Sequence, residues 1–286
     1  MSYEVRELEH EDFPHLLHQM EDPPEKLFVS GKLPGPENKF LCVVGSRKYS
    51  PYGKDVCEHL ISGLSGYNIV IVSGLAIGMD SIAHKAAIEN NLLTVAIPGS
   101  GLHPSVIYPR TNLPLANNIL NNNGALLSEF EEKFKPTLYS FPRRNRIMAG
   151  MCEATLIIEA EEKSGTLITS RLAMEYNREV LVVPGNIFSE NSLGSNALIR
   201  DGATPIFTSR DILTALNIHT EEKQIFSFSN LNPNEKVIID FLKEPRTKEE
   251  ILELSNISIS ELNILISSME IRGLIRESLG KLIRRQ

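Results

Sequence analysis

The sequence predicts an α/β fold: an extended Rossmann-like, doubly wound and mostly parallel sheet, followed by a small C-terminal winged-helix domain. From about residue 40 to residue 216, short runs of β-branched and other apolar residues alternate with amphipathic stretches at helical spacing. The apolar runs are continuous rather than alternating, which is typical of strands covered on both faces of a parallel sheet. A second periodic region, 232–286, holds three helical stretches and then a pair of short apolar runs.

Each element of the large sheet is predicted from its own pattern. The strands are the apolar runs at 40–45, 68–73, 93–97, 125–129, 154–160, 179–185 and 204–207. The helices are the amphipathic stretches at 52–65, 80–91, 112–123, 144–151, 166–177 and 209–216. In a sheet of this kind, ligands bind outside the carboxyl ends of the strands, so the loops that follow the strands are the first place to look for a site.

The chain is expected to divide into one large and one small domain. The first residues carry a short helical signal, EDFPHLLHQM, and a proline-rich passage, which is too little chain for a separate core. In the tail, helices near 233–243, 247–255 and 258–272 precede a strand pair with Leu-Gly at its tip. The predicted parts are a short N-terminal extension (1–38), a Rossmann-like domain (39–217), a polar linker (218–231) and a winged-helix-like domain (232–286).

Composition narrows the class of protein. The 286 residues carry a net charge of −7, which argues against coating nucleic acid through bulk charge but leaves room for a local basic site. The three cysteines are scattered and fit neither a disulfide framework nor a zinc site. Every apolar run is far shorter than the roughly 18 residues of a membrane helix, and the polar N-terminus is unlike a secretory signal. We therefore expect a cytoplasmic protein without membrane contact.

The loops after the predicted strands are polar and rich in glycine. GSRKYSPYG follows the first strand: Gly45 permits a tight turn, Ser46 offers a hydroxyl, and Arg47 lies where a helix N-terminus would face an anion. Later strands are followed by SGLAIGMD, EAEEKSGTLITS and PGNIFSENSLGSNALI. These are neither GxGxxG nor Walker motifs, but together they predict a phosphate-sized concavity lined by backbone N–H groups.

Several titratable residues near these loops have simpler interpretations than catalysis. Asp80 is expected to cap the helix that follows it. His84 lies in the same helix without a second ligand at metal spacing, so a packed or capping histidine is expected. Glu159, Glu161 and Glu162 could be paired carboxylates, but a solvated strand end is the favoured interpretation because no positioned nucleophile accompanies them.

The segment FPRRNRI, 141–147, follows the fourth strand and belongs to the same edge as the glycine loops. Arginine binds phosphate bidentately, and the Phe141 ring offers a stacking face to any base. Asn145 adds an amide that can hold a loop or contact a polar edge. The alternative is a helix start whose arginines pair with the preceding acids of EFEEK.

Five motifs in one order resemble the DNA-processing protein family, DprA/Smf. They are VVGSRKYSPYG, IVSGLAIGMDSIAH, PRRNRIMAGM, EEKSGTLITSRLAMEYNREVLVVPG and GSNALIRDGA. The resemblance runs from about residue 40 to residue 216. It implies an extended Rossmann-like fold that binds single-stranded DNA, protects incoming DNA and passes it to a RecA-type recombinase during natural transformation. It also implies a homodimer without catalytic activity, cofactor or metal.

The same resemblance implies roles for particular residues. Arg47 would be the main cation of a GSR loop that binds the DNA backbone, and Gly74 would keep the chain close to that phosphate. Phe141 would stack on a base, and Asn145 would fix the loop. The other implied DNA-binding residues are Gly45, Ser46, Arg143, Arg144, Arg146, Ser164, Gly165 and Thr166.

The sequence departs from the family pattern in places. Many relatives have a fuller N-terminal domain, and many have basic residues where this chain has Ile77 and Leu138. The absence of basic residues at these two positions predicts that the chain binds DNA more weakly, or that its DNA binding depends more on dimerisation. In the tail, Arg272 is the only cation of the expected recognition helix, against Glu261 and Glu270. This balance favours a protein-contact or regulatory module over a reader of duplex DNA.

Two other function classes share features with this sequence. Nucleotide phosphoribohydrolases with related folds resemble the pattern PGGxGTxxE, whose glutamate takes part in catalysis. Here the comparable segment begins at Gly165, and Thr169 stands where that carboxylate would be. The other class is a transcription factor built around the winged helix, which the cation-poor recognition helix disfavours.

Overall fold

The computed structural model describes residues 4–218, 231–255, 257–278 and 280–284. The chain forms two compact units that divide near residue 219, and each is described by itself. Most of the expected linker, 219–230, lies outside the described residues. No helix within the described ranges is long and apolar enough to cross a membrane.

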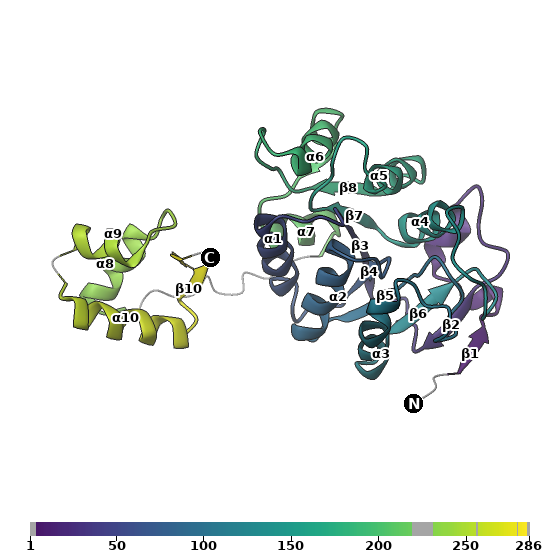
Figure 1. The fold of residues 1–286 in the computed structure, drawn as a ribbon, viewed down its shortest axis with the longest axis horizontal. Coiled ribbons are helices and arrows are strands. Elements are labelled where there is room, and N and C mark those ends of the chain that lie inside the picture. Colours follow the sequence, from purple (N-terminus) through teal and green to yellow (C-terminus); the bar gives the residue numbers. More distant parts are fainter. Residues whose placement is uncertain (1–3, 219–230, 256, 279, 285–286) are drawn as a thin grey trace. The chain divides into compact units, whose positions relative to one another are not determined.

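The first unit is built on a nine-stranded sheet (Figure 1). Its spatial order is β1-β2-β6-β5-β4-β3-β7-β8-β9. All pairs from β6 to β9 are parallel, whereas β2 joins β6 and β1 joins β2 in antiparallel pairing. The strands are β1 (Val5–Glu7), β2 (Phe28–Gly31), β3 (Lys39–Val44), β4 (Ile69–Ser73), β5 (Leu93–Ala96), β6 (Ala125–Ser128), β7 (Ala154–Ile157), β8 (Glu179–Val182) and β9 (Thr204–Pro205). The predicted Rossmann-like, mostly parallel sheet is confirmed.

The strand order reverses between β3 and β7. From β3 the chain adds β4, β5 and β6 on one side, and then returns to place β7, β8 and β9 on the other. At such a switch point the neighbouring loops diverge to opposite faces of the sheet and leave a crevice at the carboxyl ends. The loops after β3 and β7 flank that crevice.

Helices cover both faces of the sheet (Figure 1). Alternate residues of β3 separate the two cores: Leu41 and Val43 belong to one buried cluster, Cys42 and Val44 to the other. The first cluster includes residues of α1, α2 and α7, and the second includes residues of α4, α5 and α6. The helices are α1 (Pro51–Ser62), α2 (Met79–Glu89), α3 (Leu113–Asn121), α4 (Ser140–Met151), α5 (Thr166–Glu175), α6 (Glu190–Arg200) and α7 (Ser209–Ala215).

Two helices differ from the sequence prediction. Helix α4 begins at Ser140, four residues earlier than expected. Pro142 is compatible with this start because it falls in the first turn, where backbone N–H groups have no partner within the helix. Helix α6 was not predicted at all. Five of the seven residues in its first half, ENSLGSN, are Asn, Ser or Gly, which favour caps and turns, so the helix depends on tertiary packing of residues such as Leu198.

The first 38 residues join the large sheet. Strand β2 pairs with β6, and Leu27 and Val29 are buried in the same core as Val44. Two 3₁₀ turns, His10–Asp12 and His15–Gln19, lie between β1 and β2. The expected short extension is thus an edge of the sheet rather than a separate appendage.

The second unit contains three helices and a hairpin in the order expected from the sequence. They are α8 (Pro233–Phe241), α9 (Lys248–Leu254), α10 (Ile259–Ile271), β10 (Ile275–Ser278) and β11 (Lys281–Arg284). A single bridge pairs Arg246, between α8 and α9, with Leu282 of the hairpin. The unit has its own apolar core, which includes Ile238, Ile251 and Met269.

Candidate nucleic-acid interface

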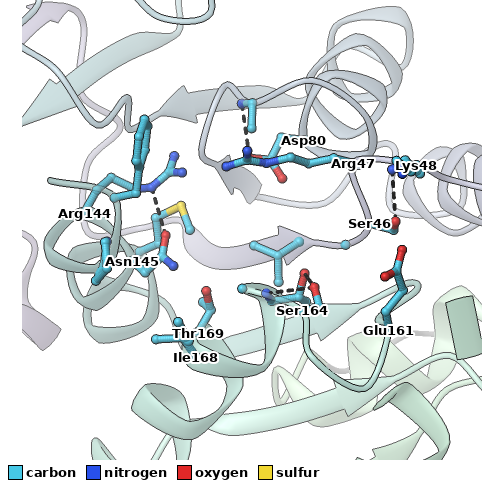
Figure 2. Close-up of a pocket in the computed structure, with 18 residues that line it drawn as sticks. Ser46, Arg47, Lys48, Asp80, Arg144, Asn145, Glu161, Ser164, Ile168 and Thr169 are labelled. Carbon is cyan, nitrogen blue, oxygen red and sulfur yellow. Dashed lines mark hydrogen bonds between the residues drawn. The ribbon is translucent and has the colours of Figure 1, made fainter. Parts of the chain in front are cut away.

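A cavity of about 480 Å³ lies at the carboxyl ends of the central strands. Loops after β3, β4 and β7 line it together with the first half of α4 and the first residues of α5. Figure 2 shows Arg47 and Lys48 on one side, Arg144 and Asn145 on another, and Ser164 and Thr169 below them. Nine of the twelve predicted DNA-binding residues line this cavity: Gly45, Ser46, Arg47, Phe141, Arg144, Asn145, Ser164, Gly165 and Thr166.

The loop after β3, residues 45–48, is folded tightly against the start of α2. A Cβ placed on Gly45 would lie 2.7 Å from Met79 Cγ, so this position has room only for glycine. Ser46 is buried: its carbonyl accepts from Met79 N at 3.2 Å, and its hydroxyl accepts from Lys48 N at 3.0 Å. This packing leaves the side chains of Arg47 and Lys48 exposed beside the cavity.

Glu159 anchors the far end of the same loop. Its carboxylate accepts hydrogen bonds from the backbone N of Ser50 at 2.9 Å and from the Ser50 hydroxyl at 2.5 Å. The Ser50 hydroxyl in turn accepts from Gly53 N and caps α1. The interpretation of Glu159 as a solvated strand end was therefore wrong, because the side chain is buried against the N-terminus of α1. Glu161 and Glu162 are exposed, as expected.

Asp80 holds the loop after β4. It is the second residue of α2, and the N-cap position belongs to Gly78, whose φ is 85°. The buried Asp80 carboxylate instead accepts from Gly74 N at 3.1 Å and from Ala76 N at 3.2 Å. Burial raises the pKa of this carboxyl, and the positive charge of Arg144 opposes that rise. The predicted capping role is corrected to that of a loop anchor.

Arg144 is buried between two strand ends. Its Nη1 donates to the carbonyl oxygens of Gly74 and, at 2.6 Å, Ile97, while its Nε donates to Asn145 Oδ1 at 3.0 Å. Burial lowers the pKa of the guanidinium, and the nearby Asp80 carboxylate raises it. Although Arg144 lines the cavity, part of its hydrogen-bonding capacity is used to hold the loops together.

Gly74 has a different role from the predicted one. A Cβ at this position would lie 1.8 Å from Arg144 Nη1, a distance that no real contact allows. The glycine makes room for the buried arginine, and Gly74 is not among the residues that line the cavity. The structure therefore gives the glycine a different reason, its close approach to Arg144, and shows no contribution of Gly74 to the lining of the cavity.

Arg143 and Arg146 point to a shared carboxylate rather than into the cavity. Glu129 Oε2 accepts from Arg143 Nη2 at 2.8 Å and from Arg146 Nη2 at 2.5 Å. Arg146 also donates to the carbonyl oxygen of Asp22. Neither arginine lines the cavity, so the structure favours the alternative, pairing with the acids of EFEEK, and their contact with DNA is untested.

Phe141 lines the cavity but is half-buried, not exposed as expected. Its ring packs on the backbone at Gly99, where an added Cβ would lie 2.6 Å from Phe141 Cδ1. It also meets Tyr108 with ring centroids 5.9 Å apart. The ring is therefore held in place by neighbours on one side while its remaining surface borders the cavity.

The start of α5 forms the floor of the cavity. Ser164 Oγ donates to Thr166 Oγ1 at 3.0 Å and accepts from Thr166 N at 3.1 Å. Gly165 is exposed, and a Cβ there would meet nothing within 4 Å. The backbone N–H groups of Leu167 and Ile168 donate to the carbonyl oxygens of Ser164 and Gly165, so the N-terminus of this ten-residue helix contributes mainly the partial positive charge of its dipole to the site.

Other residues of the cavity were not predicted. Lys48 is the most important, and the dipeptide Arg-Lys after Gly-Ser was a signal for it in the sequence. Met148 and Ile168 add apolar lining, for which no sequence signal existed. The two positions with lost basic residues, Ile77 and Leu138, are 50% and 90% exposed.

Metal binding and histidine chemistry find no support in the described ranges. No cluster of three or more His, Cys, Asp or Glu residues there could hold a metal ion. His84 is fully buried, with Nδ1 2.7 Å from the Thr94 hydroxyl, which agrees with the expected packed histidine. Burial, together with the charge of Arg144, lowers the pKa of His84 to about 3, so the ring is neutral at physiological pH.

Comparison with known proteins decides the family. The model of the family described as DNA recombination-mediator protein A matches residues 4–217. The chain belongs to this family. It is 41% identical to protein Smf of Escherichia coli over 72% of this chain and 54% of that protein, and 38% identical to the DNA processing protein DprA of Bacillus subtilis over 71% and 68%. The predicted resemblance to DprA/Smf is confirmed.

Two solved DprA structures share the fold. DprA from Streptococcus pneumoniae superposes with a TM-score of 0.68 at 37% identity, over 74% of both chains. DprA from Helicobacter pylori, whose structure was reported for its unique single-stranded DNA binding mode, gives 0.66 at 30% identity over 75% of this chain and 96% of that one.

The DprA family match ends at residue 217, so the second unit lies outside it. Its third helix, α10, contains no lysine or arginine, and Arg272, the residue that caps its C-terminus, pairs with Glu235 at 2.5 Å. Glu261, in the first turn of the same helix, accepts from Asn234 at 2.7 Å. This helix therefore offers little positive charge to a DNA groove.

Proposed function

We propose that this DprA-family chain binds single-stranded DNA in the cavity at the carboxyl ends of β3 and β7. Arg47 and Lys48 hold a phosphate, and the positive end of the α5 dipole faces the same anion. Phe141 stacks on the neighbouring base. The observation that carries the proposal is the meeting of two exposed cations, a helix N-terminus and a fixed aromatic ring at one cavity.

The geometry favours single strands over duplexes. A base can stack on Phe141 only when it is free of its own neighbours, and duplex bases are already stacked and paired. The half-buried position of the ring lowers the entropy that is lost on binding, because its neighbours Gly99 and Tyr108 hold it in place.

In the cell, we propose that the protein acts in the cytoplasm as a homodimer that protects incoming single-stranded DNA and loads a RecA-type recombinase during natural transformation. The names of its relatives and the reported DNA binding of the Helicobacter pylori protein support this role. The second unit is proposed to be a winged-helix module for protein contact, since α10 contains no lysine or arginine and Arg272, which follows it, is engaged in an ion pair.

We propose that the protein acts without catalysis or a cofactor. Thr169 is buried at the cavity, at the position where the phosphoribohydrolase pattern has its glutamate. Incubation with nucleoside monophosphates should release no free base. Release of base by the purified protein, lost on mutation of a cavity residue, would contradict this part of the proposal.

The main test is a titration of the protein with fluorescent single-stranded and duplex DNA of equal length at several salt concentrations. We expect tighter binding of the single strand, with log K falling linearly against log salt at a slope of about −0.7 per phosphate contact. Equal affinity for both forms would contradict the proposed selectivity. No binding of either form would contradict the proposed function.

A further inference from the structure

A group of exposed apolar side chains lies beside the cavity. Tyr49, just before α1, and Tyr52, in its first turn, are 44% and 48% exposed, and Ile187 and Phe188, between β8 and α6, are 71% and 90% exposed. We call these four residues the ledge. Nothing in the proposed pocket chemistry uses them, yet an exposed phenylalanine next to a polar site is a typical mark of a binding surface.

Two hydrogen bonds tie the halves of the ledge together. The Tyr52 hydroxyl donates to the carbonyl oxygen of Pro184 at 2.9 Å. Asn191 Nδ2, in the first turn of α6, donates to the carbonyl oxygen of Lys48 at 2.8 Å. The loops 47–52 and 184–191 are therefore held side by side. One of the two contacts is made by the backbone of Lys48, a residue that lines the cavity.

The turn that carries Phe188 is itself well defined. Asn186 Oδ1 accepts from Phe188 N at 2.9 Å, and the Asn186 carbonyl accepts from Ser189 N at 3.0 Å. These bonds fix the backbone while the Phe188 ring remains almost wholly in solvent. A ring displayed on a fixed backbone loses less conformational freedom when it meets a ligand than one on an unstructured loop.

We propose that the ledge is a second base-stacking site, which takes the part of a single strand that leaves the cavity past Lys48. This inference rests on the proposed function. The order of the sheet supports it, because β7, whose loop leads to the cavity floor at Ser164, lies between β3 and β8, whose loops form the ledge.

The charges around the ledge suit bases rather than phosphates. The cations Arg47 and Lys48 lie at its cavity end, whereas the exposed Glu190 follows the Phe188 turn and would repel a phosphate placed there. Aromatic rings accept any base, since every base has a π-face. The ledge should therefore contribute to affinity for long strands without adding to the salt dependence of binding.

The chain contains no tryptophan, so a single Phe188→Trp substitution provides a specific fluorescent reporter. We expect its emission to be quenched by a strand of roughly 20 nucleotides but not by one of roughly 4, which fills only the cavity. Phe207→Trp is the matched control, because Phe207 is also exposed, at 71%, but follows β9 and lies outside the ledge. Equal quenching at both positions, or none at position 188, would overturn the proposal.

Affinity gives a second readout. Phe188→Ala should weaken binding of the long strand by about 5- to 150-fold, the equivalent of one lost base stack, and leave the short strand unaffected. If wild type binds both strands and Phe188→Ala changes neither affinity, the proposed role of the ledge is refuted, but DNA binding in the cavity is not. If wild type binds neither strand, the proposed function itself fails. A change in oligomeric mass by light scattering, with DNA affinity unchanged, would assign the ledge to protein contact instead and refute the proposal.

Discussion

Two basic segments lie beside the same cavity but use their charge differently. In the loop after β3, Arg47 and Lys48 are exposed, and within the described residues neither side chain forms an ion pair or a hydrogen bond. In α4, Arg143 and Arg146 share Glu129, and Arg144 is buried against two carbonyl oxygens. A basic motif near a site therefore does not by itself indicate ligand binding. An arginine that already pairs with a carboxylate or a carbonyl oxygen of the protein is less available to a ligand than one without such a partner.

The largest expected effect comes from Arg144→Met. The substitution leaves the carbonyl oxygens of Gly74 and Ile97 without their donor and removes the positive charge near the buried Asp80. Removing one partner of a buried charged pair typically costs about 3–5 kcal/mol of unfolding free energy. Urea denaturation checks this value, with Arg200→Met, an exposed arginine, as the control. An unchanged midpoint of urea denaturation would mean that Arg144 contributes to DNA binding rather than to the stability of the fold.

Arg47→Ala should weaken single-strand binding without affecting stability. A lost charge-assisted contact is worth about 1.5–3 kcal/mol, and the loss should be similar for all base sequences because a phosphate carries no base information. The salt slope should shrink by roughly 0.7. Anisotropy titrations with two strands of different sequence measure both quantities. Lys54→Ala, which removes a cation paired with Glu58 on α1, is the control and should leave binding unchanged.

Phe141→Ala should cost about 1–3 kcal/mol of binding free energy, the usual range for one base stack. The salt slope should stay constant, since no charge is removed. Because the ring is only half-buried, the loss of stability should be smaller than the roughly 3–5 kcal/mol of a fully buried phenylalanine. A variant that melts far earlier yet binds normally while folded would show that the ring serves the core alone.

Arg143→Ala is expected to have the smallest effect. Glu129 keeps Arg146 as a partner, and the Arg143 side chain is 42% exposed, so the change in unfolding free energy should be below about 1 kcal/mol. DNA affinity should remain within about twofold of wild type, since the pair lies outside the cavity. A tenfold loss of affinity, measured in the same titrations, would place Arg143 in the DNA site and remove the contrast between the two segments.

The strands of the central sheet could be predicted because their signal is local: most are continuous runs of apolar residues, many of them β-branched. The loops after β3, β4 and β7 line the cavity as expected, because loops at the carboxyl ends of parallel strands share one edge of the sheet, whereas the loop after β8, also expected there, does not line it. The edge strands β1 and β2 were missed because Val5–Glu7 and Phe28–Gly31 are short and gain their stability from pairing with distant residues. For the same reason α6 had no local signal, since its first residues favour turns.

The roles of single side chains were harder to predict than the place of the site. Glu159 and Asp80 carry the same carboxylate as any exposed acid, and only the tertiary fold shows that each is buried against backbone N–H groups. Likewise, FPRRNRI does not reveal which arginine meets Glu129 and which faces the cavity. These assignments depend on distances between segments far apart along the chain, such as Arg144 and Gly74.

The pairing of β2 with β6 bears on how the chain is made. Phe28 pairs with Ser128, so during synthesis the earlier strand leaves the ribosome long before its partner exists. A contact of such wide sequence separation forms slowly, and until it forms the edge of β6 is open to pairing with other chains. The N-terminal segment therefore covers the edge of β6, and a chain that lost this segment would leave the edge open to aggregation.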